Sequence, residues 1–376
     1  MQADIRAVKI RILERRLQYE KKNMVTFISK WQISCASIKR HTQIALAILF
    51  TFACVTSALA ADKLSIGYLS STGQGKFFIA KDAGIFKKNG LDVELVEFSN
   101  SGDGIAAVRA GKLDAGAFGS LAPLIHVSQG ADIRVIGGLM GGDQAVITRK
   151  ENAGSVKKLS DLKGKKIATI RLGTADAIVR GGLKKEGIDW RKDVTIVELK
   201  NPPAVIEAVK NGSVYAGVTW GPHDLRAEEA GLSVVLRSKD INPGHICCRL
   251  IASLRKLEGR DDVYKRLVKS LIEAEELVAN DHKKSVDIIA KWIKLDTALV
   301  NKAFYSGYVT QDTDPNVKGV EFFWDFLKDA EFIKSDKKVS EYVITKYYRD
   351  ALTELRKQQP KSEFYAQAEK IFLSRN

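Results

Sequence analysis

The sequence predicts an α/β protein with two lobes, mixed but mostly parallel sheets and a helical C-terminal tail. Short β-rich segments alternate with amphipathic segments from residue 63 to residue 236, and this alternation is typical of a parallel sheet whose faces are covered by helices. The alternation starts again near residue 161, which indicates two units of similar size. Most segments after residue 254 have the apolar spacing of helices.

Residues 44–55 (IALAILFTFACV) have the character of a secretory signal peptide. Lys39 and Arg40 precede this apolar run of about twelve residues, and the A-x-A pattern of residues 58–60 follows it. A membrane-spanning helix needs about 20 apolar residues. We therefore expect cleavage after Ala60 and export of the protein to the periplasm.

Residues 1–60 are accordingly left out of the predicted fold. Met1 and Met24 are both candidates for the physiological start. The bulky Phe52 fits poorly in the lipid-attachment motif that Cys54 would require, so we expect the exported protein to be soluble.

The charge distribution gives no sign of a nucleic-acid partner. The chain has 60 Lys and Arg against 45 Asp and Glu, a formal net charge of +15. Residues 1–60 hold ten of the basic and three of the acidic residues, which leaves a net charge of +8 on the rest. That part contains no block of five or more like charges and no basic segment interleaved with aromatic residues.

The first unit begins with an alternating segment, KLSIGYL, which predicts a strand. Apolar residues at helical spacing follow it, and the remaining segments repeat this order. The predicted strands are residues 63–69, 93–98, 115–118, 133–139 and 145–149, and the predicted helices are residues 77–87, 104–110 and 122–130.

The second unit begins after the turn at residues 161–164 (DLKG). Thr174 is the predicted N-cap of its first helix, and Gly187 is the predicted end of that helix. The predicted strands are residues 166–170, 194–199, 216–219 and 233–236, and the predicted helices are residues 174–186, 204–211 and 223–230.

The C-terminal tail has one predicted strand, followed by helices that we expect to pack on the first lobe. The apolar residues of the second of these helices recur at i, i+3, i+4 and i+7, the pattern of a buried face. The predicted strand is residues 247–254, and the predicted helices are residues 262–280, 285–293, 297–307, 319–330, 339–357 and 364–373.

No enzyme motif is found along the chain. Residues 73–76 (GQGK) lack the spacing of a phosphate-binding loop, because Phe77 stands where Ser or Thr should bind magnesium. There is no H-E-x-x-H pair of metal ligands and no G-x-S-x-G elbow. We therefore expect a protein without catalytic residues, cofactor or metal.

Small polar residues gather where four predicted strands lead into helices. Ligands of open α/β sheets bind outside the carboxyl ends of strands, and the N–H groups at helix N-termini favour anions. These junctions supply most of the predicted ligand-binding residues: Ser71, Thr72, Gln74, Asn100, Ser101, Ser120, Arg171, Gly173 and Thr174.

Several short motifs recur together in one known family. They are residues 65–69 (SIGYL), 111–116 (GKLDAG) with 119–120 (GS), 161–166 (DLKGKK), and 211–216 (NGSVYA) with 220–222 (WGP). In these motifs the chain resembles the periplasmic solute-binding proteins of the nitrate/sulfonate/taurine type, which are related to thiamine-pyrimidine binding proteins and synthases. The resemblance covers essentially all of residues 61–376.

The resemblance implies a type II periplasmic-binding-protein fold, in which two lobes joined by two hinge strands close on a ligand. Lobe 1 would comprise residues 61–149 and 239–376, and lobe 2 would comprise residues 150–238. The implied partners are a small ligand and an ABC permease of the inner membrane, with the protein acting as a monomer.

The resemblance also points to a ligand, through one departure from the family pattern. Gly221 replaces the acidic residue that commonly precedes the proline of this motif, which favours an anionic ligand. Arg171 would pair a sulfonate, carboxylate or phosphate group, or else remain a solvated loop charge. Trp220 would form either a wall of the pocket or a packing contact at the hinge.

Adjacent cysteines follow the predicted return hinge, in a segment (GHICCR) that resembles a Cys-Cys-Arg variant within the family. Cys247 and Cys248 could form a vicinal disulfide, act as small buried apolar residues, or bind a soft metal or thiol-reactive ligand. His245 would lie on the same strand face as Cys247. We include His245 and Cys247 among the predicted ligand-binding residues.

The leading hypothesis is a receptor for a small anion such as a sulfonate, nitrate or taurine. The first alternative is a binding protein for a thiamine-pyrimidine or another neutral heteroaromatic. A thiamine-pyrimidine synthase and a ligand sensor for a membrane kinase are the remaining hypotheses.

Overall fold

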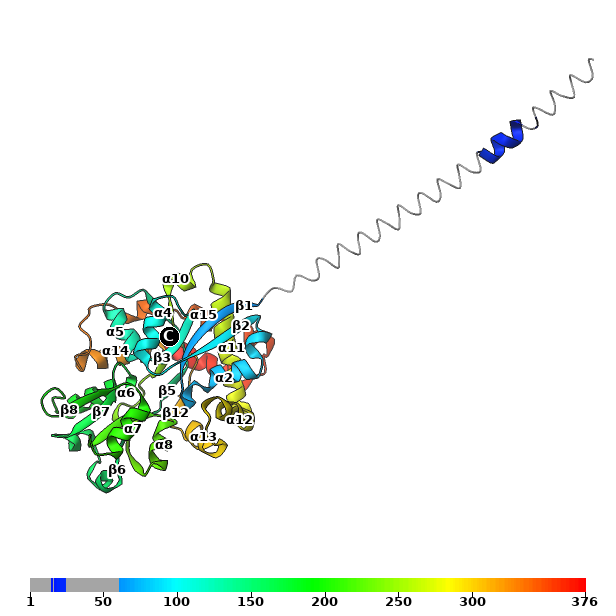
Figure 1. Ribbon diagram of the computed structural model, residues 1–376. Helices are drawn as coiled ribbons and strands as arrows, with labels where there is room; N and C mark the ends of the chain where they lie inside the picture. The colour runs from blue at the N-terminus through cyan, green and yellow to red at the C-terminus, as the bar shows by residue number, and fades with distance from the viewer. Residues whose placement is uncertain (1–14, 16, 25–60) are drawn as a thin grey trace, which may run out of the picture. The chain divides into compact units, whose positions relative to one another are not determined.

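We describe residues 15, 17–24 and 61–376 in a computed structural model of the chain (Figure 1). The predicted signal peptide, its cleavage site and Met1 lie outside the described residues. Residues 15 and 17–24 are helical, and residues 61–376 form a separate compact unit. No helix among the described residues is both long and apolar enough to cross a membrane.

The first of two five-stranded sheets has the order β2-β1-β3-β11-β4. Its strands are β1 (Asp62–Leu69), β2 (Leu91–Phe98), β3 (Ala115–Gly119), β4 (Ile133–Gly138) and β11 (Cys248–Ser253). β1 pairs in parallel with β2 and β3, whereas β11 runs antiparallel to β3 and β4. We call this sheet and the helices on it lobe 1.

The second sheet has the order β10-β6-β9-β7-β8. Its strands are β6 (Gln144–Arg149), β7 (Lys166–Ile170), β8 (Thr195–Leu199), β9 (Ala216–Trp220) and β10 (Leu232–Arg237). β7 pairs in parallel with β8 and β9, and β6 runs antiparallel to β9 and β10. We call this sheet and its helices lobe 2.

β6 belongs to lobe 2, so the boundary between the lobes lies earlier in the chain than the sequence suggested. Residues 145–149 were expected to close lobe 1, but they pair with strands of lobe 2. The chain has already left the first sheet at Gly142 and Asp143, whose φ angles are 75° and 88°. These left-handed residues redirect the backbone before β6 begins, and the hydrophobic pattern of residues 145–149 carries no information on which sheet they join.

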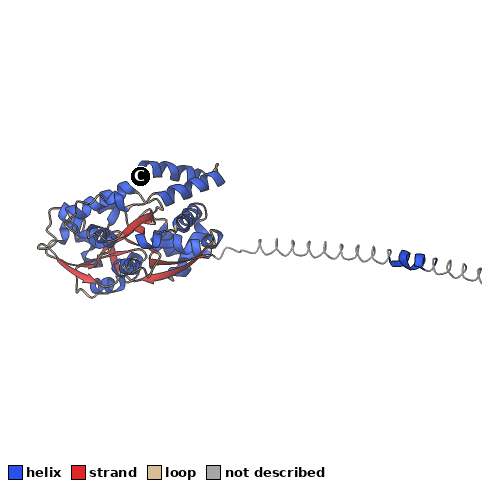
Figure 2. Cartoon of the chain, turned by 90° about the horizontal axis from the view of Figure 1, so that it is seen from above, coloured by secondary structure: helices blue, strands red, loops and turns tan. Residues whose placement is uncertain are grey.

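Figure 2 shows the helices and strands of residues 61–376 from above. Lobe 1 carries α2 (Gly75–Asp82), α3 (Ile85–Lys88), α4 (Ser101–Arg109), α5 (Leu121–Ser128) and the 3₁₀ turn η1 (Thr72–Gln74). Lobe 2 carries α6 (Thr174–Lys185), α7 (Pro202–Lys210), α8 (His223–Glu229), α9 (Ser238–Ile241), η2 (Lys150–Ser155) and η3 (Leu159–Leu162).

The C-terminal tail contacts both lobes, not lobe 1 alone as expected. α11 and α12 pack against α2 of lobe 1, but Val320 and Phe323 of α14 share a hydrophobic cluster with Ala177 and Ile178 of α6 in lobe 2. The helices of the tail are α10 (Leu254–Leu257), α11 (Asp261–Asn280), α12 (His282–Ile293), α13 (Thr297–Phe304), α14 (Val317–Asp329), α15 (Lys346–Gln358) and α16 (Glu363–Arg375).

Two details of the tail depart from the prediction. The helix expected over residues 339–357 is divided into η4 (Val339–Tyr342) and α15, because the N–H of Ile344 donates to the carbonyl of Val135 at 2.8 Å and so adds this segment to β4. A short strand pair, β5 (Met140–Gly142) with β12 (Val309–Gln311), was not predicted.

The two lobes touch each other across the cleft that separates the sheets. The Ser120 N–H of lobe 1 donates to Thr174 Oγ1 of lobe 2 at 3.0 Å. Leu172 of lobe 2 lies against Gly102 of lobe 1, with its Cδ1 only 3.3 Å from the place that a Cβ of Gly102 would take. The structure is therefore a closed arrangement of the lobes.

Gly104 of α4 offers a test of the packing in lobe 1. A Cβ there would lie 2.1 Å from Cε1 of the fully buried Phe118. We expect Gly104→Ala to lower the free energy of unfolding by about 1–3 kcal/mol, as overpacking does, although alanine is the better helix former. Gly154→Ala is the control, because a Cβ at Gly154 meets nothing within 4 Å. Equal urea denaturation midpoints for the two variants would contradict this packing.

Candidate functional site

A small buried cavity lies between the lobes, where strands of both sheets end. Leu69 ends β1, Gly119 ends β3 and Trp220 ends β9, while Ser101 and Ala175 belong to the first turns of α4 and α6. The cavity has a volume of about 20 Å³, which holds about one or two water molecules. Its lining residues are Leu69, Ser71, Gln74, Ser101, Gly119, Met140, Asp143, Gln144, Ala175, Trp220, Cys247 and Cys248.

Part of the predicted set of ligand-binding residues reaches this cavity. Gln74 is held there by two hydrogen bonds: its Nε2 donates to the Ala117 carbonyl at 3.0 Å, and its Oε1 accepts from the Leu69 N–H at 3.1 Å. Ser101 Oγ accepts from the Gly119 N–H at 3.0 Å. The predicted residues that line the cavity are Ser71, Gln74, Ser101, Trp220 and Cys247.

Two buried polar atoms near the cavity have no hydrogen-bond partner. They are Nε1 of Trp220, which lines the cavity, and Oγ1 of Thr72. Thr72 is fully buried, and its N–H donates to the Gly221 carbonyl at 3.2 Å. Because a buried donor without a partner costs stability, Nε1 of the lining residue Trp220 is a candidate donor to a ligand.

Three further predicted residues lie where the lobes meet and do not line the cavity. Thr174 accepts the hydrogen bond from Ser120, and the Ser120 hydroxyl donates to the Cys247 carbonyl. Gly173, not Thr174, is the N-cap of α6, with extended backbone at φ −83° and ψ 153°. Of these contacts, the hydrogen bond between Ser120 and Thr174 joins the two lobes.

Asn100 and Arg171 do not face the cavity. Asn100 caps α4, where its Oδ1 accepts from the Asp103 N–H at 2.9 Å. The Arg171 side chain is 73% exposed, lies 3.8 Å from Glu198 and does not line the cavity. The reason lies in the next residue, because Leu172 adopts a left-handed φ of 62° and itself turns towards lobe 1.

Asp143, which the sequence did not single out, lines the cavity at the first crossing between the lobes. Its side chain contacts both lobes: Oδ2 is 3.1 Å from Ser71 Oγ, and Oδ1 accepts from the Gly221 N–H at 3.2 Å. Burial raises the pKa of Asp143 well above its ordinary value of 3.8, and the nearby carboxylate of Asp224 adds to the shift. A raised pKa favours the protonated form of the Asp143 carboxyl group, which can donate a hydrogen bond.

A chain of hydrogen bonds connects His245 to the Cys247 thiol. His245 Nε2 lies 2.9 Å from Gln144 Oε1, and Gln144 Nε2 donates to Cys247 Sγ at 3.0 Å. His245 Nδ1 lies 2.7 Å from the Asn242 carbonyl. His245 thus supports the cavity through Gln144 and does not line it. Burial lowers the pKa of His245.

Cys247 and Cys248 are free thiols in the structure, and the predicted vicinal disulfide is not formed there. Their Sγ atoms are 3.7 Å apart, whereas a disulfide bond measures about 2.05 Å. The hydrogen bond with Cys248 lowers the pKa of the Cys247 thiol, and the same contact together with burial raises the pKa of Cys248 well above 9.0. Cys248 begins β11, and extended backbone directs adjacent side chains apart.

The lining of the cavity contains no lysine or arginine. Its polar groups are hydroxyls, amides, thiols, an indole N–H and the Asp143 carboxyl group. The first turns of α4 and α6, helices of nine and twelve residues, also border it. This set can donate several hydrogen bonds to a small molecule, and the helix N-termini favour negative charge.

Sequence reasoning missed the lining residues of the first crossing segment, Met140, Asp143 and Gln144. The available signal was the pair Gly141–Gly142 directly before two polar residues, since paired glycines mark a place where the backbone turns sharply. Interpreting residues 145–149 as a strand of lobe 1 concealed it.

Comparisons with known proteins agree with this geometry. The model of the NMT1-like family matches residues 57–294. A Brucella abortus protein described as a candidate binding protein is 28% identical over 69% of this chain and 81% of its own length. A Bacillus subtilis protein described as a candidate aliphatic sulfonate-binding protein is 25% identical, over 73% and 84% respectively. The crystal structure of the periplasmic nitrate-binding protein of Synechocystis PCC 6803 has the same fold, with a TM-score of 0.69 and 15% identity over 78% of this chain and 89% of that one.

The neutral state of Asp143 can be tested through the pH dependence of stability. Because its pKa is raised in the folded state, the unfolded chain loses this proton first as pH rises above about 4, and the native protein loses stability over that window. Asparagine cannot ionise and tolerates a left-handed φ. We expect Asp143→Asn to gain stability relative to the native sequence as pH rises from about 4 to 8 in urea denaturation.

The exposed Asp92→Asn serves as the control for this measurement. A stability difference between Asp143→Asn and the native sequence that stays constant over the same pH range would contradict a neutral Asp143.

The opposite pKa shifts of the two thiols predict which cysteine is alkylated first. Thiolates are the reactive form, and the pKa of Cys247 is lowered whereas that of Cys248 is raised. Iodoacetamide at mildly alkaline pH should modify Cys247 first in the folded, unreduced protein, as followed by peptide mass spectrometry. Initial modification of Cys248 would refute the order, and a peptide lighter by two hydrogens would reveal a disulfide in place of the free thiols.

Proposed function

Because the chain belongs to the NMT1-like family, we propose that it is the periplasmic solute-binding component of an ABC importer, which captures a small anion between its lobes. The observation that carries this proposal is the position of the cavity. It lies at the strand ends of both sheets, and residues of both lobes and of the two crossing segments line it. The known proteins that share the family or the fold are described as binding proteins, which supports a binding role rather than catalysis.

Capture would proceed by opening and closing of the lobes. The cavity of about 20 Å³ is too small for an organic ligand, and the Ser120–Thr174 hydrogen bond lies across the cleft. A ligand would enter while the lobes are apart and would then replace this contact with bonds to both of them. The closed form would be the one that a membrane permease recognises, because the ligand shifts the population towards it.

An anionic ligand would be held without a cationic side chain. The donors proposed for it are Trp220 Nε1, the protonated carboxyl of Asp143 and the first turns of α4 and α6. A carboxyl group kept neutral by burial can donate a hydrogen bond at neutral pH, and a bound anion would favour this protonated form further. The names of the sulfonate-binding and nitrate-binding relatives support this class of ligand.

A neutral heteroaromatic is the second candidate ligand, and the composition of the lining favours it. Met140 and Trp220 provide polarisable and aromatic surface in the cavity, and both pack well against rings. The absence of Lys and Arg from the lining is consistent with an uncharged ligand as well.

A thermal-shift experiment distinguishes these two ligands. Methanesulfonate, taurine, nitrate and an aminopyrimidine would each be added to the purified protein. At about 100 times its dissociation constant the true class of ligand adds about 2.7 kcal/mol of stability, and we expect this from one of the anions. Stabilisation by the aminopyrimidine alone would support the second candidate. Failure of a wider panel of small solutes would contradict a solute-binding role.

Trp220 provides a test of the site itself. Trp220→Phe keeps an aromatic ring but removes the unpartnered Nε1, and we expect the stabilising anion to bind about fivefold more weakly in calorimetry. Trp190→Phe is the matched control, since Trp190 Nε1 is also buried without a partner but Trp190 stacks on Phe332 outside the cavity. Equal affinity in Trp220→Phe and the native protein would rule out this donor.

A further inference from the structure

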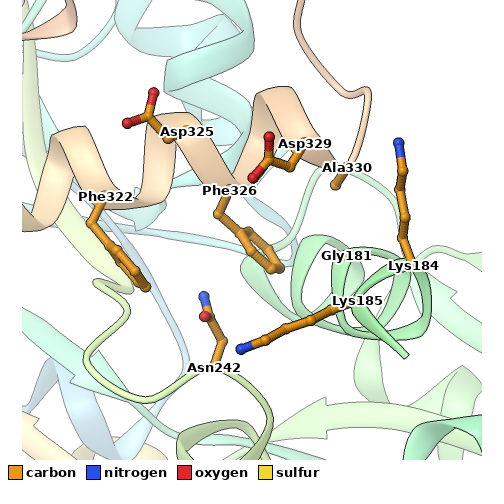
Figure 3. A pocket seen from close by; sticks show the side chains of 9 residues that line it. All are labelled: Gly181, Lys184, Lys185, Asn242, Phe322, Asp325, Phe326, Asp329 and Ala330. Carbon is orange, nitrogen blue, oxygen red and sulfur yellow. The ribbon is translucent and has the colours of Figure 1, made fainter. Parts of the chain in front are cut away.

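A second, larger cavity lies between helix α14 of the tail and helix α6 of lobe 2 (Figure 3). Its volume is about 360 Å³, against about 20 Å³ for the cavity in the cleft. Asn242 lies at its base, in the segment where the chain returns from lobe 2 to lobe 1. The proposed solute-binding role leaves this cavity without an assigned purpose.

Asn242 gives the first indication that the cavity binds a ligand. Its side chain is almost fully buried, at 3% exposure, and its Nδ2 has no hydrogen-bond partner. In Figure 3 the amide nitrogen points up between the rings of Phe322 and Phe326. A buried amide donor without a partner is costly, and an acceptor on a molecule in the cavity would satisfy it.

The apolar walls of the cavity are two phenylalanine rings on one side of α14. Phe326 is fixed, because its ring rests on Gly181 of α6, where a Cβ would lie only 2.2 Å from Cζ. Phe322 is 46% exposed, an unusual fraction for so large an apolar side chain. A flat apolar body between these rings would cover Phe322 and pack against Phe326.

Opposite charges line the two sides of the cavity. Lys185 comes from α6, and Asp325 and Asp329 come from α14. None of these three forms an ion pair with another described residue, whereas the neighbouring Lys184 is paired with Glu331 at 2.6 Å. Figure 3 shows the Lys185 ammonium group close to Asn242, and the Asp329 carboxylate on the Phe326 side. The free charges thus match a ligand that carries both signs.

We propose that this cavity binds a small zwitterion with an aromatic body, such as an aromatic amino acid. Its acid group would accept from Asn242 Nδ2 and pair with Lys185, and its ammonium group would face Asp329. The ring would lie between Phe322 and Phe326. Such a ligand would touch lobe 2 through α6 and the tail through α14, at a site separate from the cleft.

Calorimetry with three probes that share an indole tests the class of ligand. L-Tryptophan carries both charges, tryptamine only the ammonium group and indole-3-propionate only the carboxylate. We expect L-tryptophan to bind the purified full-length protein at least about tenfold more tightly than the other two, since each of them loses one charged interaction. Equal affinity of a singly charged probe, or no binding of any probe at millimolar concentration, would overturn the proposal.

Variants of exposed residues locate the site without disturbing the core. Lys185→Ala and Phe322→Ala should each weaken L-tryptophan binding by about tenfold. The matched controls are Lys328→Ala, on α14 but outside the lining, and Leu373→Ala, an apolar residue that is 73% exposed on α16; both should leave the affinity unchanged. Binding that persists in Lys185→Ala and Phe322→Ala would place L-tryptophan elsewhere, such as the cleft, and would refute this site while leaving the solute-binding proposal intact.

Discussion

The buried carboxyl group of Asp143 joins the three parts of the chain that build the cleft. It lies on the first crossing between the sheets, and its two oxygens contact Ser71 of lobe 1 and Gly221 of lobe 2. A charged carboxylate in this place would lose its hydration without gaining a cation, so burial raises the pKa of Asp143 and favours its protonated form. The rest of the cavity also lacks a cationic side chain, because its lining contains no lysine or arginine. A ligand there must be recognised by neutral hydrogen-bond donors and helix N-termini, not by ion pairs.

The C-terminal tail determines how the lobes meet on one side of the molecule. Phe323 of α14 shares an apolar cluster with Ala177 of α6, so tail and lobe 2 are joined there by a hydrophobic contact. On the opposite side the contacts are polar, as between Arg226 of α8 and the Ile293 carbonyl. The cavity at Asn242 adjoins the apolar side. The Asn242 carbonyl lies 2.7 Å from Nδ1 of His245, the residue that supports the cleft cavity through Gln144. The two proposed sites are therefore close in structure although they differ in chemistry.

The fold could be predicted largely from sequence, because hydrophobic periodicity and glycine positions record local structure directly. The strand at residues 166–170 is a clear example. What the sequence could not reveal was set by contacts between distant segments: the pairing of residues 145–149 with lobe 2, and the outward direction of Arg171, which depends on the left-handed Leu172. Of the predicted site, Ser71, Gln74, Ser101, Trp220 and Cys247 reach the cavity. Asp143 was missed because nothing in its own segment reveals that Ser71 and Gly221 will surround it.

Hydrogen–deuterium exchange can show whether the two lobes close together on one ligand. The measurement would compare the protein alone with the protein plus the small solute that stabilises it most. We expect slower exchange on both sides of the cleft at once, at residues 99–102 and 119–121 of lobe 1 and at residues 171–176 of lobe 2. The reason is that the Ser120 N–H and the first turns of α4 and α6 become enclosed. Protection confined to one lobe, or protection at neither, would contradict capture between the lobes.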